Sequence, residues 1–311
     1  MSSLDEPLGG GSEGVDILGP GAWTSLLIVT IAVRNLRRGR GDARGAARLA
    51  GALVVCWLVN WGIGDRHFGD LRFEYSLFLQ TLGNALGGAF ILALGYLALE
   101  PVMRRRCPYR LTAFARVLDG RFRDPLVGRD LLLGLALGVV SSADTALLPY
   151  GLTEFGPIVL DSQCFTKPVW YLVLAATVTI SAMWAVTSIF LVFSLIVRRD
   201  GVAAVLLAGF IAAVAVGPVA LGVGSAWMVP GGLLRMGVAV FLLFRFGVLA
   251  LLGWGFVAFS TQLMPLTLDP SAWYFGASLT KVLTVTVLAG YSAWASLGGR
   301  PLFGQGIHEE D

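Results

Sequence analysis

The feature that most constrains this chain is a series of long apolar runs, each close to the length that crosses a lipid bilayer. A helix of about 20 mostly apolar residues spans roughly 30 Å of hydrocarbon. Backbone groups in hydrocarbon must bond within their own segment, so such runs predict helices. The sequence therefore predicts an all-α fold, a polytopic integral membrane helical bundle of about eight transmembrane helices. The windows lie near residues 18–33, 46–63, 77–99, 131–150, 169–197, 202–224, 236–263 and 272–297.

Charge is scarce in this chain, which agrees with a membrane location. Charged residues make up 14% of the sequence, against about 25% in soluble domains, while 56% is hydrophobic. The net charge of +3 does not indicate a nucleic-acid partner, because the basic residues sort by membrane side rather than onto a soluble face. The three cysteines, Cys56, Cys107 and Cys164, fall in separate segments. They predict neither a disulfide framework nor a metal site.

The runs and the charges together predict one membrane domain with short flanking segments. Residues 1–17 form a flexible acidic N-terminal segment, 18–297 a single transmembrane helical domain, and 298–311 a C-terminal tail. Within the domain, 101–130 is a basic cytoplasmic loop. The first apolar run has acidic residues before it and arginines after it, so we expect a membrane anchor rather than a cleaved signal peptide.

Arginines set the expected orientation, because positive residues in short loops stay on the cytoplasmic side. They gather in the first, third and fifth loops, which predicts that the N-terminus lies outside. Two questions stay open at this point. Residues 231–268 fit either one tilted helix or two, and the side of the C-terminus depends on that choice. The loop arginines are Arg34, Arg37, Arg38, Arg40, Arg44 and Arg48, then those of residues 101–130, then Arg198 and Arg199.

The third loop contains a possible amphipathic helix. Leu111, Phe114, Ala115 and Leu118 recur at helical spacing among arginines, which favours a short helix lying in the cytoplasmic interface. We expect its basic residues to face anionic lipid headgroups or a cytoplasmic partner; arginines that merely snorkel at a membrane boundary are the simpler alternative. The predicted surface comprises Arg104, Arg105, Arg106, Arg110, Arg116, Arg121, Arg123 and Arg129.

Ionisable residues inside apolar runs are the second candidate site, because each costs about 2.5 to 3.5 kcal/mol unless it is paired or reaches an interface. The candidates are Lys281, Asp144, Arg235 and Arg245. Lys281 lies about ten residues into the last window, roughly 15 Å deep at 1.5 Å per residue. We expect it to contact backbone carbonyls or a carboxylate such as Asp144.

No cofactor, metal site or catalytic residue is predicted, and the expected bound molecules are structural lipids. The two histidines, His67 and His308, lie outside the windows, whereas membrane haem sites rely on histidines within spans. Retinal proteins carry a lysine in their last helix, but the third window here offers Gln80 and Asn84 instead of a carboxylate counter-ion. No nucleophile and base converge at one depth, so we expect no enzyme.

Three stretches resemble the membrane-embedded C-terminal region of a group of large bacterial serine/threonine protein kinases. They are residues 34–46, which begin Arg-Asn-Leu-Arg-Arg; 96–101, Tyr-Leu-Ala-Leu-Glu-Pro; and 121–130, Arg-Phe-Arg-Asp-Pro-Leu-Val-Gly-Arg-Asp. The endings 271–274 and 299–304 are also similar. The resemblance covers roughly residues 30 to 304, and it implies a kinase domain in the relatives that this chain is expected to lack.

The expected function is therefore a non-catalytic signalling or assembly subunit that works with other membrane proteins. Two alternatives stay open. A small-molecule transporter or permease is suggested by the span number, the intramembrane cations and a Gly217-Pro218 break. An accessory subunit of a photosynthetic or respiratory complex is the other. Gly83 and Gly87, four residues apart in the third window, favour close packing of helices under each of these interpretations.

Overall fold

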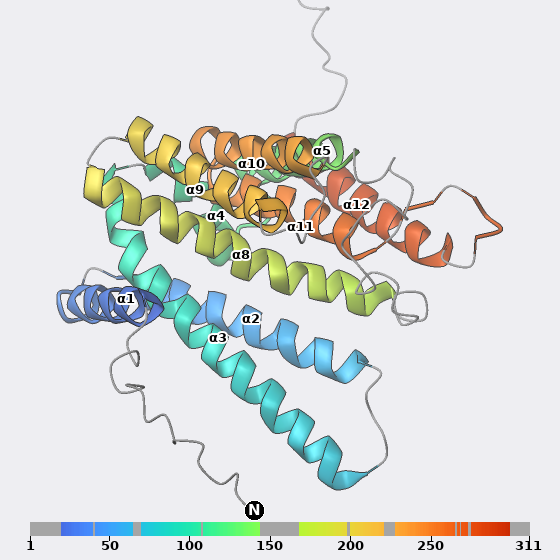
Figure 1. The fold of residues 1–311 in the computed structure, drawn as a ribbon, viewed down its shortest axis with the longest axis horizontal. Coiled ribbons are helices and arrows are strands. Elements are labelled where there is room, and N and C mark those ends of the chain that lie inside the picture. The colour runs from blue at the N-terminus through green and yellow to red at the C-terminus, as the bar shows by residue number, and fades with distance from the viewer. Residues whose placement is uncertain are drawn as a thin grey trace, which may run out of the picture.

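The computed structural model contains helices, and no strand, within the residues that it describes (Figure 1). Those residues are 20–39, 41–64, 70–106, 108–143, 168–197, 200–220, 228–264, 266–267, 269–272 and 275–298. The helices are α1 Pro20–Arg37, α2 Ala43–Ile63, α3 Leu71–Arg106, α4 Pro108–Leu118, α5 Pro125–Ser141, α8 Pro168–Val197, α9 Asp200–Ala220, α10 Met228–Arg245, α11 Val248–Leu263 and α12 Phe275–Ser296.

Three of the described helices are long and apolar enough to cross a membrane. They are Ala43–Ile63, Leu71–Arg105 and Pro168–Phe190, in α2, α3 and α8. The apolar stretches Gly201–Phe210 and Val248–Leu263 are shorter. The all-helical membrane character is thus present in the structure, and the number of eight spans stays a prediction.

Residues 231–268 contain two helices rather than one, which answers a question that the sequence left open. The break lies at Gly247, between α10 and α11, where φ is +97°. The backbone N–H groups of Phe246 and Gly247 both donate to the carbonyl of Leu242, at 2.9 Å each, and so close the end of α10. With φ +97° and ψ −166°, Gly247 has a backbone conformation that is essentially confined to glycine, because glycine has no Cβ atom to clash.

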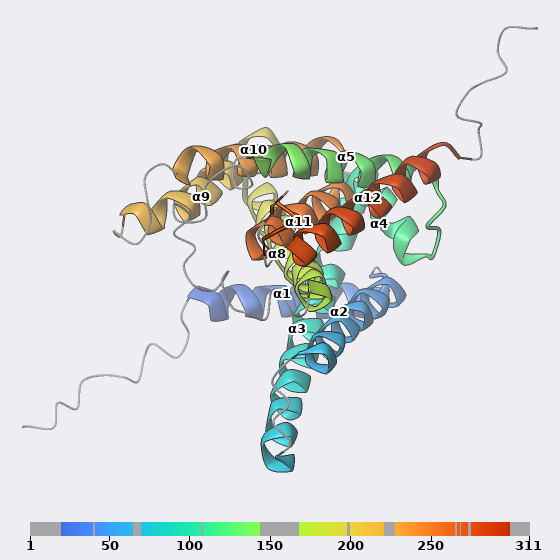
Figure 2. The same ribbon diagram turned by 90° about the vertical axis from the view of Figure 1, so that its right-hand side faces the viewer.

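The central helix of the core is α11, which is buried along most of its length and packs against α5, α8 and α10. Its neighbour α5 also packs against α12, and the three helices lie close together in Figure 2. Gly134 of α5 lies directly against the backbone of Ala250 in α11. One turn further along, the indole Nε1 of Trp254 donates to the Ser141 hydroxyl at 2.8 Å. Small residues thus let two apolar helices approach closely, as in membrane proteins generally.

Two hydrogen bonds bring distant segments to one end of the molecule. The Arg48 guanidinium donates to the carbonyl of Leu118 at 2.6 Å, which joins the first loop to the third. The Tyr291 hydroxyl donates to the carbonyl of Phe122 at 2.9 Å, which brings the end of α12 to the third loop. We call residues 34–48, 104–129 and 291–298 the arginine end. The last described turn of the chain therefore lies on the same side as the arginine-rich loops.

Candidate functional site

A buried asparagine repairs the hydrogen-bond gap that a proline leaves in α3. Pro101 has no N–H to donate to the carbonyl of Leu97, four residues earlier. The Asn35 side chain of α1 donates to this carbonyl at 3.0 Å and to that of Ala98 at 3.3 Å. Asn35 is buried, so the bond replaces water that cannot reach the site. Two stretches more than 60 residues apart are thereby joined.

Glu100 continues this joint toward the first loop. Its carboxylate is buried, accepts from the backbone N–H of Asp42 at 3.1 Å, and forms an ion pair with Arg104. Asp42 in turn caps α2 by accepting from the N–H of Gly45 at 2.9 Å. We call Asn35, Asp42, Glu100 and Arg104 the polar joint. Its polar atoms bond α1, α3 and the start of α2 to one another.

Replacement of Asn35 by leucine is expected to destabilise the protein by about 1 to 3 kcal/mol, because two buried carbonyls lose their donor. The measurement is thermal unfolding of the purified protein in mild detergent. A double-mutant cycle supplies the control: in Pro101→Ala, the new N–H at position 101 can serve Leu97 within the helix. Asn35→Leu should then cost clearly less, and equal costs in both backgrounds would contradict the repair mechanism.

Most arginines of the predicted surface do lie exposed at the arginine end. Beside them, Arg116 forms an ion pair with Asp124, the residue that caps α5. Burial acts to raise the pKa of Asp124, but hydrogen bonds from Arg116 and from the Leu126 N–H outweigh it and hold the pKa below its usual range. The side chain of Arg106 lies outside the described residues. The exposed members are Arg104, Arg105, Arg121, Arg123 and Arg129, joined by Arg34, Arg37, Arg38, Arg44 and Arg48 of the first loop.

Arg110 departs from the expected surface position. Its side chain is only 4% exposed, and the guanidinium carbon lies 4.4 Å from the ring centre of Phe244 and 5.2 Å from that of Phe190. The reason is that the apolar side of α4, with Leu111 and Phe114, packs into the protein core instead of the membrane interface. The predicted helix is present, but the protein covers its apolar face. Arg110 is therefore held by aromatic rings.

Lys281 contacts a backbone carbonyl, one of the two kinds of partner expected for it. Its ammonium group is buried and donates to the carbonyl of Met264 at 2.9 Å. Met264 is the C-cap of α11, so the cation lies at the negative end of that helix dipole. Because α12 begins at Phe275, Lys281 lies about 9 Å from the start of that helix. Its depth in a membrane stays a prediction.

The described residues include three of the four intramembrane candidates, namely Lys281, Arg235 and Arg245. Lys281 lies near the start of α12, whereas the end of this helix belongs to the arginine end. Arg235 is in the middle of α10, and Arg245 is exposed at its end with the guanidinium 5.8 Å from the ring centre of Phe246. Asp144 lies outside the described residues. The three described candidates thus lie at the start of α12, in the middle of α10 and at the end of α10.

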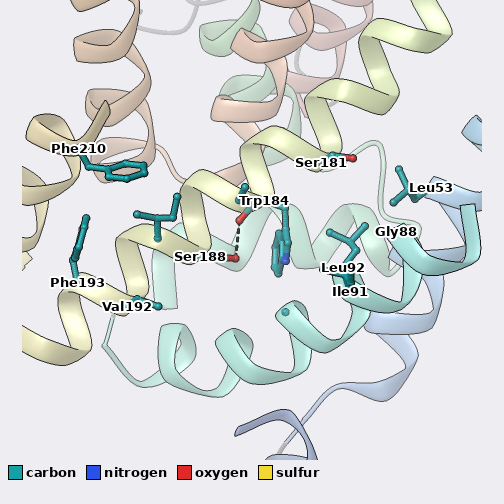
Figure 3. A pocket seen from close by; sticks show the side chains of 13 residues that line it. Leu53, Gly88, Ile91, Leu92, Ser181, Trp184, Ser188, Val192, Phe193 and Phe210 are labelled. Atoms are coloured by element: carbon teal, nitrogen blue, oxygen red, sulfur yellow. Dashed lines mark hydrogen bonds between the residues drawn. The ribbon is translucent and has the colours of Figure 1, made fainter. Parts of the chain in front are cut away.

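An apolar pocket of about 580 Å³ opens between α2, α3, α8 and α9, within the size range of small-ligand sites (Figure 3). The Ser181 and Ser188 hydroxyls in its wall donate to carbonyls of their own helix, those of Thr177 and Trp184. The indole of Trp184 lines the wall, with its Nε1 buried against Gly95. The pocket suits an apolar group such as a lipid chain, and its lining includes neither Lys281, Arg235 nor Arg245.

Sequence reasoning missed the polar joint and this pocket. The sequence does contain a sign of the polar joint at Pro101, because a proline inside a helix leaves the carbonyl four residues earlier without its N–H donor. No pattern in the sequence specified Asn35 as its donor.

Comparison with known protein families, curated proteins and solved structures gives no match.

Proposed function

We propose that this chain is a non-catalytic subunit for signalling or assembly in a bacterial inner membrane, related to the membrane module of bacterial serine/threonine kinases. The observation that supports it is the polar joint. Asn35 and Asp42 come from one stretch that carries the resemblance, and Glu100 comes from another. The resemblance therefore includes residues that work together in three dimensions.

In this proposal, the arginine end is the cytoplasmic contact surface, and the N-terminus lies outside. Loops one and three meet there through the bond from Arg48 to Leu118, so their positive charges act as one field rather than two. Such a field attracts anionic lipid headgroups at about 1 kcal/mol for each arginine near the surface, and it attracts acidic protein surfaces in the same way. The polar joint keeps the field in a fixed position relative to α3.

The test neutralises four exposed arginines outside the polar joint at once, in the variant Arg38→Gln, Arg105→Gln, Arg121→Gln and Arg123→Gln. We expect recovery of partner proteins from native membranes in mild detergent to fall at least about tenfold, because several favourable charges are lost. Arg72→Gln, an exposed position at the far end of α3, is the control and should leave recovery unchanged. Mass spectrometry of copurified anionic lipid separates a headgroup role from a protein partner. Isolation of the unmodified chain as a lone monomer would contradict the proposal.

The permease and accessory-subunit interpretations receive no further support. A permease would be favoured by a cavity lined with the intramembrane cations, and the described pocket is lined instead by apolar side chains and two engaged hydroxyls. The pocket fits an apolar occupant of a structural subunit equally well. Both interpretations therefore stay as predictions.

A further inference from the structure

One exposed face of α3 combines side-chain amides with glycines. Gln80, Gly83, Asn84 and Gly87 occupy positions i, i+3, i+4 and i+7, which lie on one side of a helix. All four are exposed, whereas the other side of the helix is buried against the protein at Ala85, Ala89 and Leu92. We call these four residues the amide-glycine face. In both ribbon views, the N-terminal turns of α3 extend beyond the neighbouring helices (Figures 1 and 2).

The position of Asn84 along α3 places its amide inside the apolar layer. The rings of Trp61 and Phe78, 5.1 Å apart, join the end of α2 to α3. Asn84 lies six residues further into α3, about 9 Å deeper. On the neighbouring helix α2, the side chains of Val55 and Val59 are exposed and apolar. Within the described residues, the Asn84 carboxamide has no hydrogen-bond partner, and in hydrocarbon that costs several kcal/mol.

The two glycines leave room for a partner to approach this amide. A Cβ atom built on Gly83 or Gly87 would meet nothing within 4 Å, so the bundle itself does not use this small-residue pair. By contrast, Gly88 on the adjoining side already faces Leu53. Glycines four apart allow close backbone contact between membrane helices, and amides such as Asn and Gln bond across such contacts. The partner must therefore offer both a close helix backbone and amide-like groups at the same depth.

We propose that the partner is a second copy of this chain, with the α3 helices packed face to face about a two-fold axis. A carboxamide is both donor and acceptor, so Asn84 can bond to its own counterpart. A two-fold axis along the membrane normal puts identical residues of the two copies at identical depth. The second copy therefore supplies both the close helix backbone and the amide at the depth of Asn84. This inference rests on the membrane location in the proposed function, but not on the arginine end or on the resemblance.

The positional test is disulfide cross-linking of the full chain in native membranes, after replacement of Cys56, Cys107 and Cys164 by serine. We expect Gly87→Cys to give an adduct of twice the chain mass under mild oxidation. Leu86→Cys is the matched control, because Leu86 is 54% exposed but lies outside the amide-glycine face. Equal cross-linking at 86 and 87, or none at 87 in a folded protein, would overturn the proposal. An adduct of another mass would mean a different partner helix and would overturn it as well.

A second set of variants tests the amide itself. Asn84→Leu should lower the dimer fraction several-fold, and Asn84→Gln should restore much of it, since only glutamine keeps donor and acceptor. Both variants should retain the thermal unfolding temperature of the monomer, because Asn84 contacts nothing that stabilises its own bundle. A dimer fraction unchanged in Asn84→Leu would refute the amide contact. Unchanged partner recovery in the arginine variant, with intact cross-linking at position 87, would reject the proposed function alone.

Discussion

Replacement of Gly134 by leucine is expected to prevent folding in the membrane. A Cβ atom at this position would overlap the backbone carbonyl of Ala250 in α11, and backbone cannot rotate away as a side chain can. The two helices would have to separate, and the bond from Trp254 to Ser141 would break with them. We expect a loss of more than about 4 kcal/mol, comparable with the whole stability of many domains.

Gly134→Ala measures the same contact with the smallest possible side chain. It should lower the thermal unfolding temperature in detergent strongly, and lower the yield of folded protein. Gly290→Ala is the control, since it is also helical but faces open space, where alanine is expected to stabilise the helix by about 0.5 to 1 kcal/mol. If both alanine variants unfold at the same temperature, close contact between α5 and α11 does not determine stability.

The second large effect is expected at Gly247, between α10 and α11. Its φ of +97° disfavours any side chain, and a Cβ atom would also overlap the backbone of Arg110 in α4. Gly247→Ala should therefore cost more than about 3 kcal/mol, the sum of backbone strain and displacement of α4. The displacement would move the Arg110 guanidinium away from the Phe244 ring, a contact now at 4.4 Å.

A glycine that also has a positive φ, but has no close neighbour, helps to separate the two causes. Gly120 has a φ of +81° and open space around it, so Gly120→Ala should cost only the backbone part, about 1 to 2 kcal/mol. Urea or thermal unfolding of both variants in the same detergent gives the comparison. A Gly247→Ala protein as stable as Gly120→Ala would show that α4 yields easily at this contact.

Periodicity and run length predicted the helical class well, because each apolar run has to satisfy its own backbone. They also placed a helix near Leu111 and Phe114, at residues now within α4. They could not tell what covers its apolar face, since protein core and lipid are equally apolar. Nor could run length resolve the break at Gly247, which depends on the capping bonds to Leu242 rather than on hydropathy.

Site prediction was weaker for a related reason. A buried cation such as Lys281 is visible in a sequence, but its partner is a backbone carbonyl, and every residue has one. The depth of that lysine depends on where α12 begins, at Phe275, and helix ends are the least certain part of a reading by hydropathy. The pairing of Asn35 with Leu97 is a contact between helices that no local pattern contains.

The bond between Asn35 and α3 also bears on the order of events during synthesis. A ribosome releases α1 first, and the acceptor carbonyls at residues 97 and 98 follow more than 60 residues later. At 5 to 20 residues per second, roughly, the amide of Asn35 spends several seconds without its final partner. The helix α1 therefore reaches its final contacts only after α3 has been synthesised. A chain that terminates before Ala98 would lack an acceptor for the Asn35 amide.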